Sequence, residues 1–169
     1  MRVTFLAHDG FLIELDSVCL LFDWWKGALP PLPDKPLLVF VSHRHADHFQ
    51  PEIFRLADKK SDLQFLLGSD LRLTPRNLEK WDLTPETATD EGVAWFVTAE
   101  GKFIFHAGDL NWWHWEGEDK AWSANMAADF KRYTEPLRGR CADLALLPLD
   151  PRLGVPYAYW GLLRFLELM

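Results

Sequence analysis

The sequence lacks the features that mark secreted and membrane proteins. It has two cysteines among 169 residues, which is too few for the disulfide framework of a small secreted domain. No apolar run approaches the ~20 residues of a membrane-spanning helix, and the first ten residues contain no signal-peptide core. We therefore expect a cytoplasmic protein that does not bind membranes. Cys19 and Cys141 both stand in apolar runs, so we expect two buried thiols.

An excess of positive charge is also missing. The chain carries 18 Lys and Arg against 25 Asp and Glu, which gives a formal net charge of -7. A polyanion would be repelled on average, so no nucleic-acid partner is expected. Internal repeats, low-complexity tracts and flexible linkers are absent as well, and the length fits one domain with a core of ordinary size. We expect residues 1–169 to form a single domain.

Short apolar segments rich in β-branched and aromatic residues predict many strands, and helical patterns fall between them. The mixture indicates an α/β (α+β) fold built in layers. Strands are expected at 2–7, 11–15, 17–23, 37–42, 63–69 and 142–150, with a hairpin around the turn AEGK at 99–102. Helices are expected at 51–60, 74–81, 119–139 and 157–169.

Three of the six histidines stand together in the segment VFVSHRHADHF, residues 39–49. His43, His45 and Asp47 are spaced by two and should project to one side of an extended chain. His48 should turn away from this side, toward a neighbouring metal position. Asp47 and His48 are also expected to open a helix. Imidazole and carboxylate groups are suitable ligands for zinc, and also for manganese or iron. The pattern therefore predicts a site for one or two divalent metal ions rather than a solvated polar loop.

This motif resembles the H-x-H-x-D-H signature of the metallo-β-lactamase-fold hydrolases. The family's opening strands resemble FLAHDGFLIEL (5–15), and the strand before its metal strand resembles CLLFDWW (19–25). A later strand with a bridging aspartate, as in the family's cytosolic members, resembles KFIFHAGDLN (102–111). The resemblance implies an αββα four-layer sandwich of two mixed β-sheets, with the site at one edge. It implies the metal ligands His43, His45, Asp47, His48 and Asp109, with Asp47 and Asp109 also as catalytic residues.

The chain departs from the family pattern in two places. The family has another histidine before the bridging aspartate, but none stands between His48 and His106. Asp90 or Glu91, in the segment TPETATDEG, are candidate replacements. A late histidine is also missing, since none follows His114, and the chain ends within a predicted helix. We therefore expect a domain that lacks the family's C-terminal part, and a site with one metal stays an alternative to a site with two.

Further polar and aromatic residues are expected around the metals. The histidines near the motif can bind metal or support its ligands. The tryptophans near the strand ends can form a rim for a substrate or pack in the core, and an arginine can clamp an anionic group or stand in a surface turn. The possible additional or supporting residues are Asp90, His106, His114, His8 and Asp150, and the possible substrate-binding residues are Trp25, Trp113 and Arg152.

The leading hypothesis is a metal-dependent hydrolase that uses a metal-activated water on an ester, lactone, amide or small phosphoester. Its partner would be a small-molecule substrate and its cofactor Zn²⁺, with manganese or iron as alternatives. A non-catalytic member of the fold with one or no metal is the second hypothesis, and an iron-containing redox member is the third. Exposed sheet edges and an apolar stripe at Leu162, Phe165 and Leu166 also suggest a homo-oligomer.

Overall fold

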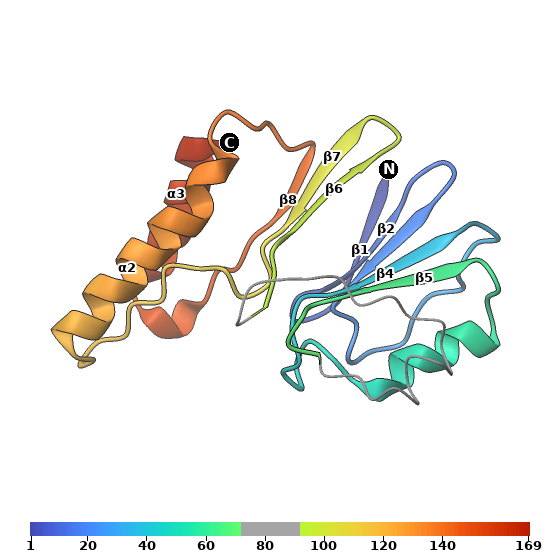
Figure 1. Cartoon of the computed structure of the whole chain (residues 1–169), viewed down its shortest axis with the longest axis horizontal. Helices are drawn as coiled ribbons and strands as arrows, with labels where there is room; N and C mark the ends of the chain where they lie inside the picture. Colours follow the sequence, from blue (N-terminus) through green and yellow to red (C-terminus); the bar gives the residue numbers. More distant parts are fainter. Residues whose placement is uncertain (72–91) are drawn as a thin grey trace.

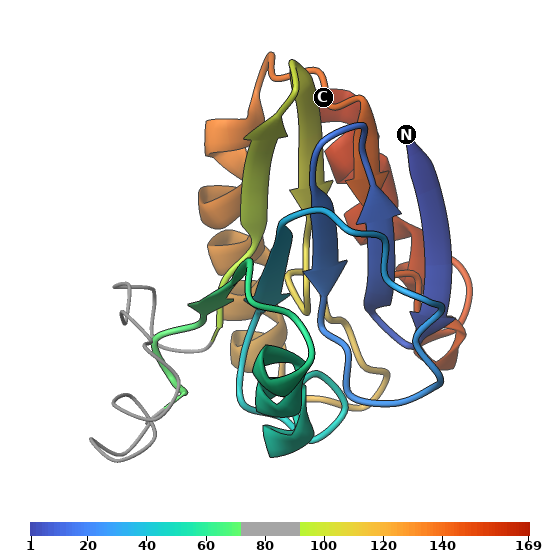
Figure 2. The same ribbon diagram turned by 90° about the vertical axis from the view of Figure 1, so that its right-hand side faces the viewer.

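The computed structural model describes residues 1–71 and 92–169 and arranges them in four layers. Two β-sheets face each other, as Figure 1 shows. Helices α2 (Lys120–Thr134) and α3 (Tyr157–Leu168) cover the outer face of one sheet, and the 3₁₀ helix η1 (Pro51–Asp58) lies outside the other. Figure 2 looks onto the first sheet, with η1 (teal) in front of the sheets and α2 (orange) behind them. The predicted αββα sandwich is therefore confirmed.

The first sheet has the strand order β1-β2-β3-β4-β5. Strands β1 (Arg2–Ala7), β2 (Gly10–Glu14) and β3 (Cys19–Phe22) pair in antiparallel fashion. Strands β4 (Leu37–Val41) and β5 (Leu63–Leu67) then continue the sheet in parallel with β3. This pairing brings the carboxyl ends of β1, β3, β4 and β5 to the same edge, so the residues that follow these strands meet there.

The second sheet has the order β6-β7-β8. Strands β6 (Trp95–Ala99) and β7 (Lys102–His106) form the predicted hairpin. Its turn residues Glu100 and Gly101 both have positive φ, 51° and 71°, as a two-residue turn between twisted strands requires. Strand β8 (Leu144–Leu146) pairs in parallel with β7. The sheet is mixed, like the first.

Apolar side chains fill all three spaces between the layers. Phe22 and Phe40 stack at 4.6 Å and meet Ile104 between the two sheets. Continuous apolar strands such as β4, with little alternation, are typical of a sheet covered on both faces. The other two clusters lie between the first sheet and η1, with Leu21, Val39, Ile53 and Phe54, and between the second sheet and the helices, with Phe105, Phe130 and Phe165.

Four details differ from the sequence prediction. Cys141 is exposed rather than buried, because it lies in the connection before β8 and not in the strand. The helix expected at 51–60 does begin at Pro51, but it is a 3₁₀ helix, and Asp47 and His48 do not open it. Asp47 and His48 therefore lie in a turn. Phe165 is buried against the second sheet, so the predicted exposed stripe on α3 is interrupted.

In the ranges 1–71 and 92–169, no helix has the length and apolar character to cross a membrane. The helix predicted at 74–81 lies outside these ranges.

Candidate metal centre

Four chain segments converge at the shared edge of the two sheets. The β1–β2 turn brings His8 and Asp9, the end of β3 brings Asp23, and the segment after β4 carries the histidine motif. Asp109 follows β7 from the second sheet. In the described part of the chain, six residues from these segments form two groups, each with ligand atoms within 4.8 Å of one another, and Asp23 belongs to neither.

The first group contains His43, His45 and Asp109. His43 Nε2 lies 2.9 Å from His45 Nδ1 and 3.3 Å from Asp109 Oδ2. Two ring nitrogens and one carboxylate oxygen therefore face a common point. This ligand set suits zinc.

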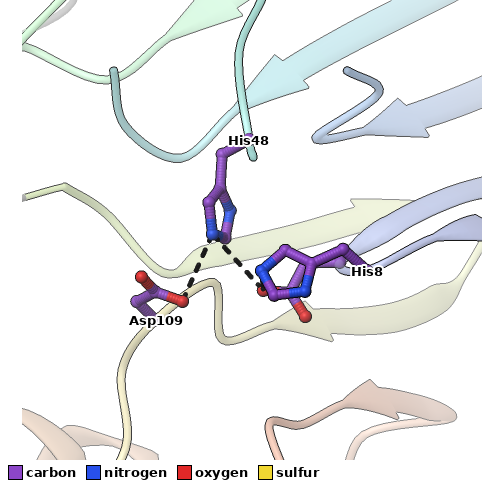
Figure 3. A group of neighbouring side chains, drawn as sticks. His8, His48 and Asp109 are labelled. Atoms are coloured by element: carbon purple, nitrogen blue, oxygen red, sulfur yellow. Dashed lines mark ion pairs between the residues drawn. The ribbon is translucent and has the colours of Figure 1, made fainter. Parts of the chain in front are cut away.

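The second group contains His8, Asp9, His48 and Asp109. His48 Nε2 lies 3.3 Å from Asp109 Oδ1 and 3.6 Å from Asp9 Oδ2. His8 Nε2 is 3.8 Å from the same oxygen of Asp9. Figure 3 shows the His48 ring pointing between Asp109 and the β1–β2 turn that carries His8.

The Asp109 carboxylate belongs to both groups, with Oδ2 facing His43 and Oδ1 facing His48. Its neighbour Gly108 has a φ of +54°, and a Cβ there would lie 3.0 Å from Ser42 Cβ. Only glycine fits this close approach without strain. The indole Nε1–H of Trp113 donates to the Asp109 carbonyl at 2.9 Å. The backbone thus holds the carboxylate where it can bridge two ions.

Asp23 and Ser42 orient the two central histidines. The buried Asp23 carboxylate accepts hydrogen bonds from the Ser42 hydroxyl at 2.6 Å and from His48 Nδ1–H at 2.9 Å. Because the Ser42 proton is directed to Asp23, Ser42 Oγ accepts from His43 Nδ1–H at 2.9 Å. Both rings are therefore held in the tautomer that leaves Nε2 with its lone pair toward the two groups.

The charges in the site are strongly coupled. Burial opposes ionisation of Asp109, but His43 and His48 hold the pKa of its carboxyl well below its usual range. Burial also acts to lower the pKa of His48, yet the nearby carboxylates of Asp109 and Asp23 outweigh this and raise that pKa to about 10. Burial raises the pKa of Asp9, partly offset by His48 and His8. These carboxylates attract a proton in the metal-free chain, and they would attract a metal cation in the same way.

A buried nitrogen tests whether a cation fits. The His48 side chain is 0% exposed, and its Nε2 makes no hydrogen bond of acceptable geometry. Buried polar atoms normally have a partner. A cation between His48, Asp109 and Asp9 would supply one, so the residues present fit a metal ion.

Two predicted residues lie close to these groups without belonging to them. Asp47 is 53% exposed, and its Oδ2 lies 3.4 Å from His8 Nε2 at the rim of the site. His106 is buried, its Nε2–H donates to the Asp9 carbonyl at 2.9 Å, and its Nδ1 accepts from the Gly108 amide at 3.2 Å. Since both ring nitrogens are used, His106 supports the site and does not point a free nitrogen into it.

The other predicted residues lie farther out. His114 packs against Tyr157 and Trp160, with ring centroids 4.3 and 5.1 Å away. Asp150 accepts from Arg152 Nε at 2.9 Å, and the Arg152 guanidinium lies over the Trp115 ring at 5.8 Å.

Trp115 in turn is parallel to Trp113, at 6.2 Å between centroids. Trp25 is half-buried, with Lys26 Nζ 5.5 Å from its ring centroid. Asp90 lies outside the described residues.

Asp9 is the site residue that the sequence reasoning missed. It stands next to His8 in a two-residue turn between paired strands, since Ala7 pairs with Gly10. The sequence predicts this turn, but it does not predict the direction in which the Asp9 side chain points. Asp23 was noticed only as a strand end, and its role depends on its burial beside Ser42 and His48.

Comparisons with known proteins agree with this geometry. A family model described as "Beta-lactamase superfamily domain" matches residues 2–120, which include both groups. A UPF0173 metal-dependent hydrolase of Desulforamulus reducens is 40% identical over 65 residues, 36% of this chain and 28% of that protein. A second one, from Opitutus terrae, is 42% identical over 53 residues, 28% of this chain and 23% of that protein.

A Mycolicibacterium smegmatis protein named as a putative Rieske 2Fe-2S iron-sulfur protein is 34% identical over 95 residues, 47% of this chain and 18% of that protein. The chain thus matches less than a third of the length of each of these relatives. No solved structure gives a significant match. Because the family model covers well over half of the chain and the two facing sheets have the expected layers, the chain belongs to the beta-lactamase superfamily and has the metallo-β-lactamase fold.

Proposed function

We propose that the chain is a metal-dependent hydrolase acting on an ester, lactone, amide or small phosphoester. The observation that carries this proposal is the position of Asp109. Its two carboxylate oxygens each lie 3.3 Å from the Nε2 atom of a different histidine, His43 and His48. Two adjacent groups that share one carboxylate are suited to a pair of divalent ions. The metal-dependent hydrolases among the matched relatives support the same reaction class.

The donor atoms favour zinc over manganese. Four imidazoles, those of His8, His43, His45 and His48, outnumber the carboxylates in the two groups. Nitrogen-rich sites suit zinc, whereas manganese prefers more oxygen. When bound, such an ion lowers the pKa of a coordinated water toward ~7 and polarises the bond to be cleaved.

The protein residues would position the reactants and handle protons. Asp23 and Ser42 keep the Nε2 lone pairs of the histidines directed at the groups. Asp109 is 42% exposed, so a small substrate can approach it. Asp47, exposed beside His8, can accept the proton that the attacking water loses and return it to the leaving group.

An iron-containing redox function has weaker support. One relative is named as a Rieske protein, but a Rieske centre needs two cysteines and two histidines on one cluster. Cys19 is buried between the first sheet and η1, and Cys141 is exposed before β8. Neither cysteine belongs to the two groups found in the described chain.

Metal content and turnover together test the proposed function. The protein would be purified without added metal, analysed for zinc, manganese and iron, and assayed on nitrophenyl esters, lactones, amides and nitrophenyl phosphoesters. We expect about two zinc ions per chain and hydrolysis of at least one substrate class that chelation removes and zinc restores. His114→Gln is a matched control, because His114 lies outside both groups.

Two other results would contradict the proposal. A chain that retains no metal and turns over none of these substrates would be a non-catalytic member of the fold. Stoichiometric iron without hydrolysis would favour the redox alternative.

A further inference from the structure

The ion position beside His48 has few ligands from the histidine motif and the β7 end. From these segments only His48 and Asp109 place an atom in that group. A zinc ion normally has at least three protein ligands in a catalytic site and four in a structural one. Other residues must therefore complete the position, and the sequence has no histidine between His48 and His106 to do so.

The β1–β2 turn brings two side chains to this place. Asp9 Oδ2 lies 3.6 Å from His48 Nε2, and His8 Nε2 lies 3.8 Å from the same oxygen. These separations exceed hydrogen-bond length but leave room for ligands around one cation, because each ligand atom would be about 2 Å from the ion. Asp9, His8, His48 and Asp109 thus face a single point.

The turn is held in this conformation by the protein itself. His8 has a φ of +52°, an uncommon conformation for a residue with a side chain. A Cβ at Gly10 would lie 2.9 Å from the Ala7 carbonyl oxygen and 3.2 Å from that of Asp23, so the turn packs closely on the end of β3. His106 Nε2–H fixes the Asp9 carbonyl at 2.9 Å. The backbone of the turn therefore directs the Asp9 carboxylate toward the group.

Charge gives an independent reason for a cation. The half-buried carboxylates of Asp9 and Asp109 stand on either side of the fully buried His48 Nε2, which has no hydrogen-bond partner. Two like charges this close repel each other unless a positive charge lies between them, which is the proton on His48 in the metal-free chain and would be the ion when metal replaces that proton. A divalent ion would offset both carboxylates and bind the lone pair of His48.

We propose that the β1–β2 turn completes the second metal position, with the Asp9 carboxylate and the His8 imidazole binding a divalent ion together with His48 and Asp109. The inference rests on the proposed function for the presence of a metal at Asp109. It assigns the remaining ligands to a turn from the opposite end of the chain.

Zinc binding by the metal-stripped chain tests the assignment. Zinc would be titrated in competition with a chromophoric chelator into the parent protein, Asp9→Asn and His8→Gln. We expect Asp9→Asn to weaken one zinc ion at least ~10-fold, which is the lower end of what removing even a supporting partner costs. His8→Gln should weaken the same ion. The ion bound by His43 and His45 should stay.

Two controls separate ligand loss from misfolding. Asp16→Asn removes a carboxylate from the β2–β3 turn, at the opposite edge of the first sheet, and should leave zinc binding unchanged. Asp9→Asn keeps the backbone carbonyl that accepts from His106. Its Tm without metal should therefore match the parent, while the increase in Tm on adding zinc should shrink.

The possible outcomes distinguish this inference from the proposed function. Parent-like zinc binding by both Asp9→Asn and His8→Gln would overturn the inference alone. So would loss of the ion in Asp90→Asn while Asp9→Asn keeps it, because the missing ligand would then lie elsewhere. A parent protein that binds no zinc or other divalent ion would overturn the proposed function as well.

Discussion

At the scale of single residues, Asp109 is the side chain on which both groups depend. Its oxygens face His43 and His48 separately, and Gly108 and Trp113 fix its backbone. Two divalent ions about 4 Å apart repel by roughly 16 kcal/mol at an effective dielectric constant of about 20, unless anionic ligands compensate. One bridging carboxylate reduces this repulsion for both ions at once.

Asp109→Asn keeps the shape of this side chain and removes its charge. We expect the variant to lose one zinc ion before the other and to hydrolyse substrate at least ~100-fold more slowly, a barrier increase of about 2.7 kcal/mol. Zinc content after dialysis and initial rates under saturating substrate would measure both effects. If the variant keeps two ions and full activity, Asp109 is not the bridge.

The pKa of His48 predicts how the metal-free protein responds to pH. In the folded chain the pKa is raised to about 10 from an ordinary value of 6.5. A group with a raised folded pKa stabilises the fold fully below its unfolded pKa, and this stabilisation is lost as pH rises through the folded pKa. We therefore expect the Tm in EDTA to fall between about pH 6.5 and pH 10.

Thermal unfolding in EDTA across this range would measure the effect. His114→Gln should show the parental decline, whereas His48→Gln should show a shallower one. A parental Tm that is flat from pH 6.5 to pH 10 would contradict the prediction.

At the scale of elements, the local pattern of the sequence located the strands well. The apolar run of β4, the AEGK hairpin and the proline at the start of η1 each depend on near neighbours in the chain. The helix type of η1 could not be predicted from the sequence, because a 3₁₀ helix of eight residues is unusual. His43, His45 and His48 were recognised from their density and spacing directly after a predicted strand, and Asp109 from the family resemblance of the segment that ends β7.

Long-range placement was not accessible from the sequence. Asp9 enters the site because β1 and β2 pair beside β3, and because His106, 97 residues away, holds its carbonyl. His114 is five residues from Asp109 in sequence, yet it packs on Tyr157 and Trp160 of α3. Contacts between distant segments decide both positions, and a local pattern contains no information about them.

A chain of contacts that runs from Asp109 through the connection after β7 to Arg152, after β8, leads us to expect a substrate preference. The Trp113 indole donates to the Asp109 carbonyl, and the Trp115 ring is parallel to the Trp113 ring. The Arg152 guanidinium lies over the Trp115 ring. Asp150 accepts from Nε and Nη2 of Arg152, so Nη1 is directed away from this pair. The Arg152 side chain is 73% exposed, and its free edge can bind an anionic group.

We expect Arg152→Gln to raise KM about tenfold for substrates that carry a carboxylate or phosphate, because a charged hydrogen bond is lost. The kcat value and the KM of neutral substrates should change little. Steady-state kinetics on matched charged and neutral esters would measure this. Arg138→Gln is the control, since Arg138 pairs with Glu135 after α2. An equal loss for both ester types would assign Arg152 a structural role.

At the scale of the whole molecule, the core and the candidate metal centre occupy different places. Three apolar clusters hold the four layers together, while both groups of ligands lie at one edge, in segments that follow strands. A domain of this length buries enough apolar surface to fold without a metal. The metal should therefore serve the chemistry and contribute only modestly to the fold.

The double substitution His43→Ala with His45→Ala tests this separation. It removes two of the three ligands of the first group but leaves the apolar clusters intact. We expect the variant to lose the ion bound there and to keep its far-ultraviolet circular dichroism spectrum. Its Tm in EDTA should stay within about 8 °C of the metal-free parent, since loss of the exposed His45 and of the buried, hydrogen-bonded His43 together costs about 2 kcal/mol. If the metal-free parent and the variant are both unfolded, the metal is structural, as in domains that fold only when they bind it.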